Sequence, residues 1–153
     1  PQEQIPYQPS FRMLTVVAQA NDFDFEKVRA YYEDHLKTEF DVRRLRERFE
    51  RARRWIEKYA PEEMKFCIKK NIEVRLDIKQ RGIVKEVRRA LEVTDDCSAM
   101  FAEFKRIAQV NDVQVKEFFA LMYGVILGKE RGPKLAEFVI DNKVKVMALL
   151  KKV

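Results

Sequence analysis

Histidine and cysteine are scarce in this chain, which has one histidine and two cysteines among 153 residues. The single histidine, His35, excludes every catalytic or metal-binding motif that needs two histidines, such as H-E-x-x-H. Cys67 and Cys97 lie far apart and form no CxxC pair, so the sequence indicates neither a zinc site nor a disulfide framework. We expect both cysteines to be small core side chains in a reducing compartment.

Glycine and long apolar runs are scarce as well. The chain has four glycines and contains no Walker or Rossmann phosphate loop and no G-x-S-x-G motif. Its longest uncharged run is far shorter than the roughly 20 apolar residues that cross a bilayer. The sequence therefore predicts no membrane association, no metal and no catalytic constellation, and it favours a soluble cytoplasmic protein. Because the chain begins at Pro1 without a methionine, we expect it to be part of a longer polypeptide.

Basic and apolar side chains are abundant. Lys and Arg outnumber Asp and Glu by 31 to 25, which gives a net charge of +6. This charge is compatible with an acidic partner such as nucleic acid, although many plain helical proteins are equally basic. The hydrophobic share of 46% is enough to bury the core of one domain or of two small subdomains.

Apolar residues follow helical spacing over most of the chain. Ser10, Asp24 and Asp41 offer N-cap side chains for the first three helices, the third of which runs to Tyr59. We expect a capping box of Asn111 with Gln114 further along. The remaining helices are expected at 61–70, 83–93, 97–108, 115–127, 133–140 and 144–150.

A different pattern interrupts the helices from Ile72 to Lys79, where apolar and charged residues alternate. Alternation is typical of extended chain, but no second strand is available to pair with it, so we expect an extended connector laid on helices. The sequence therefore predicts an all-α fold of two small helical subdomains, residues 1–71 and residues 72–153, and the second subdomain begins with the connector.

The long helix of the first subdomain is rich in arginine, with eight Lys and Arg residues against four Asp and Glu. Three of its acid–arginine pairs have the spacing of helical ion pairs: Glu47–Arg51, Glu50–Arg53 and Glu50–Arg54. A solvated, salt-bridged face is one interpretation. The other is a phosphate-contacting ridge, for which guanidinium groups are well suited. That ridge would consist of four arginines outside these pairs: Arg43, Arg44, Arg46 and Arg48.

The most informative stretch runs from Val115 to Val139. No charged residue occurs from Phe118 to Leu127, which predicts a buried central helix. Gly128 stands where a C-cap glycine is expected, and Pro133 where a first-turn proline begins the next helix. The residues between them form a short, mainly basic surface loop, at which an anion would find positive charge and backbone N–H groups together.

The sequence of this stretch, MYGVILGKERGPKLAEFVI, resembles a pattern near the end of class I lysyl-tRNA synthetases. In that pattern a helix ends in an aliphatic residue and glycine, basic residues and Gly-Pro follow, and a helix runs toward the C-terminus. A looser version closes glutamyl-tRNA synthetases. The segment from Ile5 to Val17 is similar to the one that follows the catalytic half of the lysyl enzymes. The HIGH-type and KMSKS-type motifs of the family are absent from this chain.

The resemblance implies the C-terminal part of a class I lysine–tRNA ligase, an all-helical cage that binds the anticodon stem and loop of a lysine-accepting tRNA. It implies that ATP and Mg²⁺ bind only in an N-terminal catalytic domain of the same polypeptide, so this segment needs no cofactor, and whether it acts as an enzyme stays open. It places RNA contacts around the Gly-Pro turn, at Lys129, Arg131, Gly132, Pro133, Lys134 and Leu135.

Three alternatives remain from the sequence. The Arg-rich helix could bind an acidic protein surface in a helical protein-interaction module. The chain could be a glutamyl-type anticodon-binding domain. The Gly-Pro pair could also serve only to end one helix and begin the next, with no role in binding.

Overall fold

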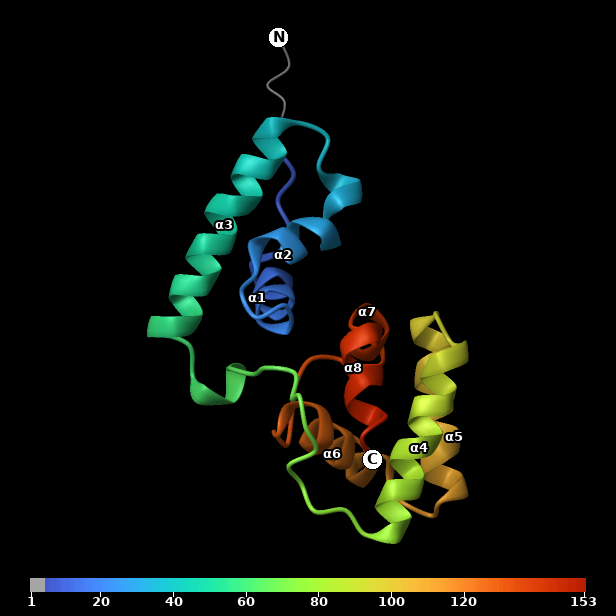
Figure 1. Ribbon diagram of the computed structural model, residues 1–153. Coiled ribbons are helices and arrows are strands. Elements are labelled where there is room, and N and C mark those ends of the chain that lie inside the picture. Colours follow the sequence, from blue (N-terminus) through green and yellow to red (C-terminus); the bar gives the residue numbers. More distant parts are fainter. Residues whose placement is uncertain (1–4) are drawn as a thin grey trace. The chain divides into compact units, whose positions relative to one another are not determined.

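The computed structural model describes residues 5–153, and these residues are helical with irregular connections (Figure 1). They form eight α-helices and two 3₁₀ turns, and no β-strand occurs within this range. The predicted all-α class is confirmed. The chain forms two compact units that divide between Cys67 and Ile68, whereas the sequence placed the boundary at 71 and 72. Each unit is described by itself.

The first unit is built from three α-helices around a small core. α1 packs along α3, and α2 contacts both. Its elements are α1 (Phe11–Ala20), α2 (Phe25–Tyr31), a 3₁₀ turn (Glu33–His35), α3 (Glu39–Lys58) and a second 3₁₀ turn (Glu62–Met64). The core side chains, all buried, are Leu14, Val17, Ala18, Phe25, Val28, Tyr32, Leu45, Phe49 and Ala52.

The first two predicted helix starts are confirmed. Ser10 caps α1 and Asp24 caps α2, and each side-chain oxygen accepts a hydrogen bond from a backbone N–H of the first helical turn. Between the two helices, Asp22 and Phe23 adopt positive φ angles of 53° and 58°. A right-handed helix cannot continue through two such residues, which is why α1 and α2 are separate.

The start of α3 was predicted wrongly, because Thr38 rather than Asp41 is the N-cap. Asp41 is the third residue of a capping box: its N–H donates to Thr38 Oγ1 at 3.3 Å, and its Oδ2 accepts from the N–H of Thr38 at 3.0 Å. The same carboxylate accepts from the N–H of Lys37 at 2.8 Å and from the N–H of Tyr7 at 2.7 Å. Asp41, 7% exposed, therefore ties the segment before α1 to the start of α3.

Acid should weaken the first unit through Asp41. Backbone N–H groups, that of Tyr7 foremost, stabilise the charged carboxylate and lower its pKa from the ordinary 3.8. A lowered folded-state pKa contributes stability that is complete above the unfolded value and is lost as the pH falls through the folded value. We expect Asp41→Asn to lower the free energy of unfolding at neutral pH and to flatten its fall in acid.

Urea unfolding followed by the fluorescence of Trp55, which lies on α3, measures this effect across the pH range. Asp34→Asn, at an exposed position of the first 3₁₀ turn, is the matched control. An identical acid decline in the two variants would contradict the role given to Asp41.

The second unit consists of five helices. They are α4 (Ile78–Val93), α5 (Cys97–Val110), α6 (Val115–Leu127), α7 (Leu135–Asp141) and α8 (Lys143–Leu150). α5 contacts α4, α6 and α7, and α8 contacts α4 and α7 (Figure 1). The middle position that the sequence assigned to α6 therefore belongs to α5.

α6 has a buried and an open side. The side chains that it buries are Phe118, Met122, Val125, Ile126 and Leu127. Two further residues were expected in the core. Val115 is exposed, and Phe119 is half-buried. The absence of charge along this helix thus reflects only in part a buried environment.

The connector lies on α6 as an extended chain. Its apolar residues Ile72, Val74 and Leu76 are half-buried, and the charged residues between them are exposed, as the alternation predicted. The N–H of Lys69 donates to the carbonyl of Ile126 at 2.8 Å, and this bond pairs a carbonyl of the last turn of α6. The helix expected at 61–70 is wrong beyond its first residues, because only Glu62–Met64 forms a 3₁₀ turn.

Other expected helix starts also shift. α4 begins at Ile78 instead of residue 83, because Asp77 and Gln80 form a capping box, and Ile78 is left 91% exposed. Asn111 is the C-cap of α5 rather than part of a capping box, and Gln114 caps α6 without a side-chain hydrogen bond. The helix expected to begin at Pro133 begins at Leu135.

The cysteines are not core residues, since Cys67 is exposed and Cys97 half-buried.

Candidate nucleic-acid interface

The loop of residues 128–134 joins α6 to α7. Gly128 ends α6 in the left-handed conformation, with φ 66°, which confirms it as the C-cap. Its N–H donates to the carbonyl of Gly124 at 3.1 Å, and the N–H of Lys129 donates to that of Tyr123 at 3.4 Å. Two carbonyls near the end of the helix are thereby paired, and the bond of Gly128 is the one that defines an αL C-cap.

The far end of the loop is held on the side of α6. The hydroxyl of Tyr123 donates to the carbonyl of Pro133 at 2.5 Å. A methyl group on Gly132 would lie 2.8 Å from Cδ1 of Leu127 and 3.0 Å from Cε1 of Tyr123, so only glycine fits here without a shift of its neighbours. Burial raises the pKa of Tyr123, and the N–H of Leu135 partly offsets this. The hydroxyl therefore keeps its proton for the bond at neutral pH.

The loop presents cationic side chains on its outer side. Arg131, Gly132 and Lys134 are exposed, and Lys129 and Pro133 are half-buried. This places five of the six predicted positions at the surface. The sixth, Leu135, is 3% exposed, so its side chain packs in the core and only its backbone is near the loop.

The start of α7 lacks the features expected of an anion-binding helix start. The helix has seven residues, its N-cap Lys134 makes no side-chain cap bond, and Glu137 lies in its first turn. An anion at this loop would therefore be held by lysine and arginine side chains rather than by the helix dipole. A further lysine, Lys69, borders the loop, because its Cε would lie 2.7 Å from a methyl group on Gly128.

The arginines of α3 lie in the first unit, and the ion pairs differ from those predicted. Arg44 pairs with Glu47 at 3.3 Å and Arg53 with Glu57 at 3.0 Å. The expectation that Arg44 is unpaired is therefore wrong. The other three predicted phosphate-contacting residues also touch their own unit. Arg43 lies 5.6 Å from the ring centroid of Phe40, Arg46 lies 4.0 Å from that of Phe25, and Arg48 donates to the carbonyl of Pro9 at 3.1 Å.

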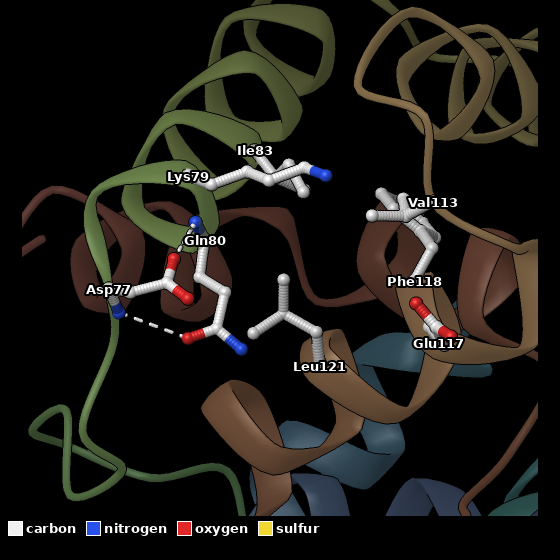
Figure 2. Close-up of a pocket in the computed structure, with 8 residues that line it drawn as sticks. All are labelled: Asp77, Lys79, Gln80, Ile83, Val113, Glu117, Phe118 and Leu121. Carbon is white, nitrogen blue, oxygen red and sulfur yellow. Dashed lines mark hydrogen bonds between the residues drawn. The ribbon is translucent and has the colours of Figure 1, made fainter.

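A hollow of about 230 Å³ opens between the beginnings of α4 and α6 (Figure 2). Its lining is Asp77, Lys79, Gln80, Ile83, Val113, Glu117, Phe118 and Leu121. Asp77 and Gln80 are engaged with each other in the capping box, at 2.7 Å and 3.0 Å. The remaining lining is one ammonium and one carboxylate around apolar side chains. No nucleophile–base pair occurs among these lining residues, and none of the predicted site residues lies here.

Within residues 5–153, no three His, Cys, Asp or Glu side chains come together as metal ligands. None of the helices in the described part of the chain is both long and apolar enough to cross a membrane. His35 stacks on the ring of Tyr7, with centroids 4.5 Å apart.

Comparison with known proteins gives the chain a family context. No protein-family model matches it. The lysine–tRNA ligase of Pyrococcus horikoshii is 34% identical over 148 residues, which cover 90% of this chain and 28% of that protein. The lysine–tRNA ligase of Methanopyrus kandleri is 31% identical over 155 residues, 91% of this chain and 28% of the relative. The lysine–tRNA ligase of Borrelia garinii is 28% identical over 158 residues, which cover 97% of this chain and 30% of that protein.

The chain is homologous to a segment of the lysine–tRNA ligases. The resemblance to lysyl-tRNA synthetases stated from the sequence is thereby confirmed. The chain spans about 28% of the length of these relatives.

Two contacts at the loop went unnoticed in the sequence, those of Tyr123 and Lys69. Tyr123 stands one turn before Leu127, on the helix flank that the loop folds back onto, and this spacing was the available signal. Lys69 is distant in sequence from Gly128, so no local pattern could have linked the two.

Substitution of glycine tests how closely the loop packs. Gly132→Ala should lower the free energy of unfolding by about 1–3 kcal/mol, because the added methyl meets Leu127 and the ring of Tyr123. Gly82→Ala is the matched control: it lies inside α4 with nothing within 4 Å of an added methyl. There alanine should raise stability by about 0.4–1 kcal/mol. Urea unfolding followed by circular dichroism measures both, and a neutral Gly132→Ala would contradict the packing.

Proposed function

We propose that this chain binds the anticodon stem and loop of a lysine-accepting tRNA, as the anticodon-binding part of a cytoplasmic class I lysine–tRNA ligase. The observation that carries the proposal is the cationic loop 128–134, fixed to α6 in a chain homologous to a segment of lysine–tRNA ligases. Those relatives are named for joining lysine to tRNA. The second unit, residues 68–153, is the RNA-binding one in this proposal.

The chemistry of the loop suits an RNA strand. Arg131 and Lys134 are exposed and can contact phosphate groups, which orient the RNA without reading its sequence. Gly132 has no side chain above its backbone, so an unstacked base can approach the peptide group closely. Affinity then comes from the phosphate contacts, and specificity comes from bases splayed out of the anticodon loop.

The arginines of α3 have a secondary place in this proposal. Arg43 and Arg46 are exposed, and Arg44 and Arg48 are half-buried, so each still offers some surface to a phosphate. Their contacts with Glu47, with aromatic rings and with the carbonyl of Pro9 would have to be shared or exchanged. We therefore expect them to contribute less than the loop.

This segment would recognise tRNA and leave the chemical step to another part of the ligase. It has no HIGH-type or KMSKS-type motif, and the hollow between α4 and α6 offers no nucleophile with a base among its lining residues. ATP and Mg²⁺ would bind in an N-terminal catalytic domain of the same polypeptide.

The proposal predicts salt-dependent binding of lysine-accepting tRNA that weakens when the anticodon is changed. Arg131→Ala should cost about 1.5 kcal/mol of binding free energy and reduce the salt dependence by about one phosphate contact. Arg89→Ala, at an exposed position of α4, removes the same charge outside the loop and should change little. Filter binding or fluorescence anisotropy at several salt concentrations measures all three proteins.

Three other outcomes of the binding experiment would each favour a different interpretation of the chain. Equal affinity for every tRNA, together with no loss in Arg131→Ala, would contradict the proposed site. A preference for glutamate-accepting tRNA would assign the chain to the glutamyl type. Absence of RNA binding at low salt would favour the protein-interaction module.

A further inference from the structure

Three aromatic rings form a row across α5 and α6 that ends at the basic loop. Phe101 on α5 and Phe119 on α6 have centroids 6.3 Å apart and planes 22° apart. Phe119 and Tyr123, one turn apart on α6, have centroids 6.4 Å apart and planes 28° apart. The three rings are here called the aromatic row, and within each neighbouring pair the planes are less than 30° apart.

The aromatic row is open on one side and supported on the other. Phe101 is 41% exposed, and Phe119 and Tyr123 are half-buried. Two buried rings hold Phe119 by edge contacts, Phe118 at 5.8 Å with planes 78° apart and Phe104 at 6.0 Å with planes 86° apart. The middle ring of the row is therefore fixed by packed core rings and loses little conformational freedom when something binds to it.

Positive charge stands at both ends of the aromatic row. Nζ of Lys105 lies 4.5 Å from the centroid of Phe101. At the other end the ring of Tyr123 lies against Gly132, next to Arg131 in the loop. Lys116 is exposed one turn before Phe119 on α6, and helical spacing puts these two residues on neighbouring positions.

Acids also occur near the aromatic row, because Glu117 is exposed beside Lys116 on α6 and Glu130 is exposed beside Arg131 in the loop. Glu103, on the same helix as Phe101, is paired with Arg106 at 2.8 Å. Asp96, Glu137 and Asp141 act on Cys97 at the start of α5, where they raise the pKa of its thiol together with burial, the larger cause. These three acids therefore lie near Cys97 at the start of α5, and along the row the cations Lys105, Lys116 and Arg131 outnumber the acids Glu117 and Glu130.

A row of aromatic rings between cationic side chains suits a single RNA strand. Bases stack on aromatic rings whatever their sequence, and lysine and arginine hold the phosphates that connect them. An apolar protein surface would use the rings but would leave these cations without a counter-charge. We propose that the aromatic row is a stacking surface for unpaired bases of an RNA loop; this inference rests on the RNA binding proposed above.

The test replaces the rings without changing charge. The variants are Phe101→Leu and Phe119→Leu, with Phe11→Leu as control, since Phe11 is 39% exposed and has an edge contact with Trp55 in the first unit.

Two probes are used: a hairpin with the anticodon loop of lysine-accepting tRNA, and a linear oligonucleotide of the loop sequence. Circular dichroism melting checks the fold, and Phe101→Leu, at the more exposed position, carries the test alone if Phe119→Leu unfolds.

We expect each ring variant to bind both RNAs at least about fivefold more weakly than the wild type. The salt dependence should be unchanged, because no phosphate contact is removed. Phe11→Leu should bind like the wild type, and Phe101→Tyr, which keeps a stacking face, should restore binding.

The outcomes separate this inference from the proposed function. Unchanged RNA affinity in both ring variants, with a wild type that discriminates between anticodons, would overturn the stacking surface and leave the function standing. Ring-dependent binding of the linear oligonucleotide without discrimination between anticodons would support the surface and contradict the function. A dimer lost in the ring variants, with RNA affinity unchanged, would identify a protein interface and overturn the proposal.

Discussion

The hydrogen bond from Tyr123 to the carbonyl of Pro133 is the constraint on which the candidate site depends. It acts together with Gly132, whose backbone lies so close to the Tyr123 ring and Leu127 that a methyl group would fit only if these side chains shifted. The buried side of α6 packs against α5, which fixes the position of the helix. The hydrogen bond of Tyr123 then holds the loop against this helix. Cationic side chains are thus presented from an ordered backbone, which lowers the entropy lost when a partner binds.

Asp41 has a corresponding role in the first unit. One carboxylate accepts hydrogen bonds from three backbone N–H groups, those of Tyr7, Lys37 and Thr38. Because an unpaired buried carboxylate is costly, Asp41 favours the arrangement in which all three N–H groups reach it. The segment before α1, the turn before α3 and the first turn of α3 are therefore parts of one structure, which holds the N-terminal end of the Arg-rich helix in place.

Local chemistry made the helical class, the caps Ser10, Asp24 and Gly128, and the alternating connector predictable from sequence. It failed where two residues compete for one role, as when Thr38 rather than Asp41 caps α3. It also failed where the answer depends on distant partners. The arginines of α3 illustrate this, because packing of the unit brings Arg46 to the ring of Phe25 and Arg48 to the carbonyl of Pro9. Arg44, in contrast, pairs within its own helix, with Glu47. The site followed the same rule: the basic loop was visible, while the burial of Leu135 and the Tyr123 contact required the fold.

The central claim is that RNA meets the second unit at the loop between α6 and α7. Hydrogen–deuterium exchange of the chain with and without saturating lysine-accepting tRNA tests it directly, because exposed loop amides exchange quickly unless a partner covers them. We predict slower exchange from Lys129 to Lys134 in the bound chain, with Gly82 and its neighbours on α4 unchanged. Bound tRNA that leaves these loop amides unprotected and protects another surface would contradict the account.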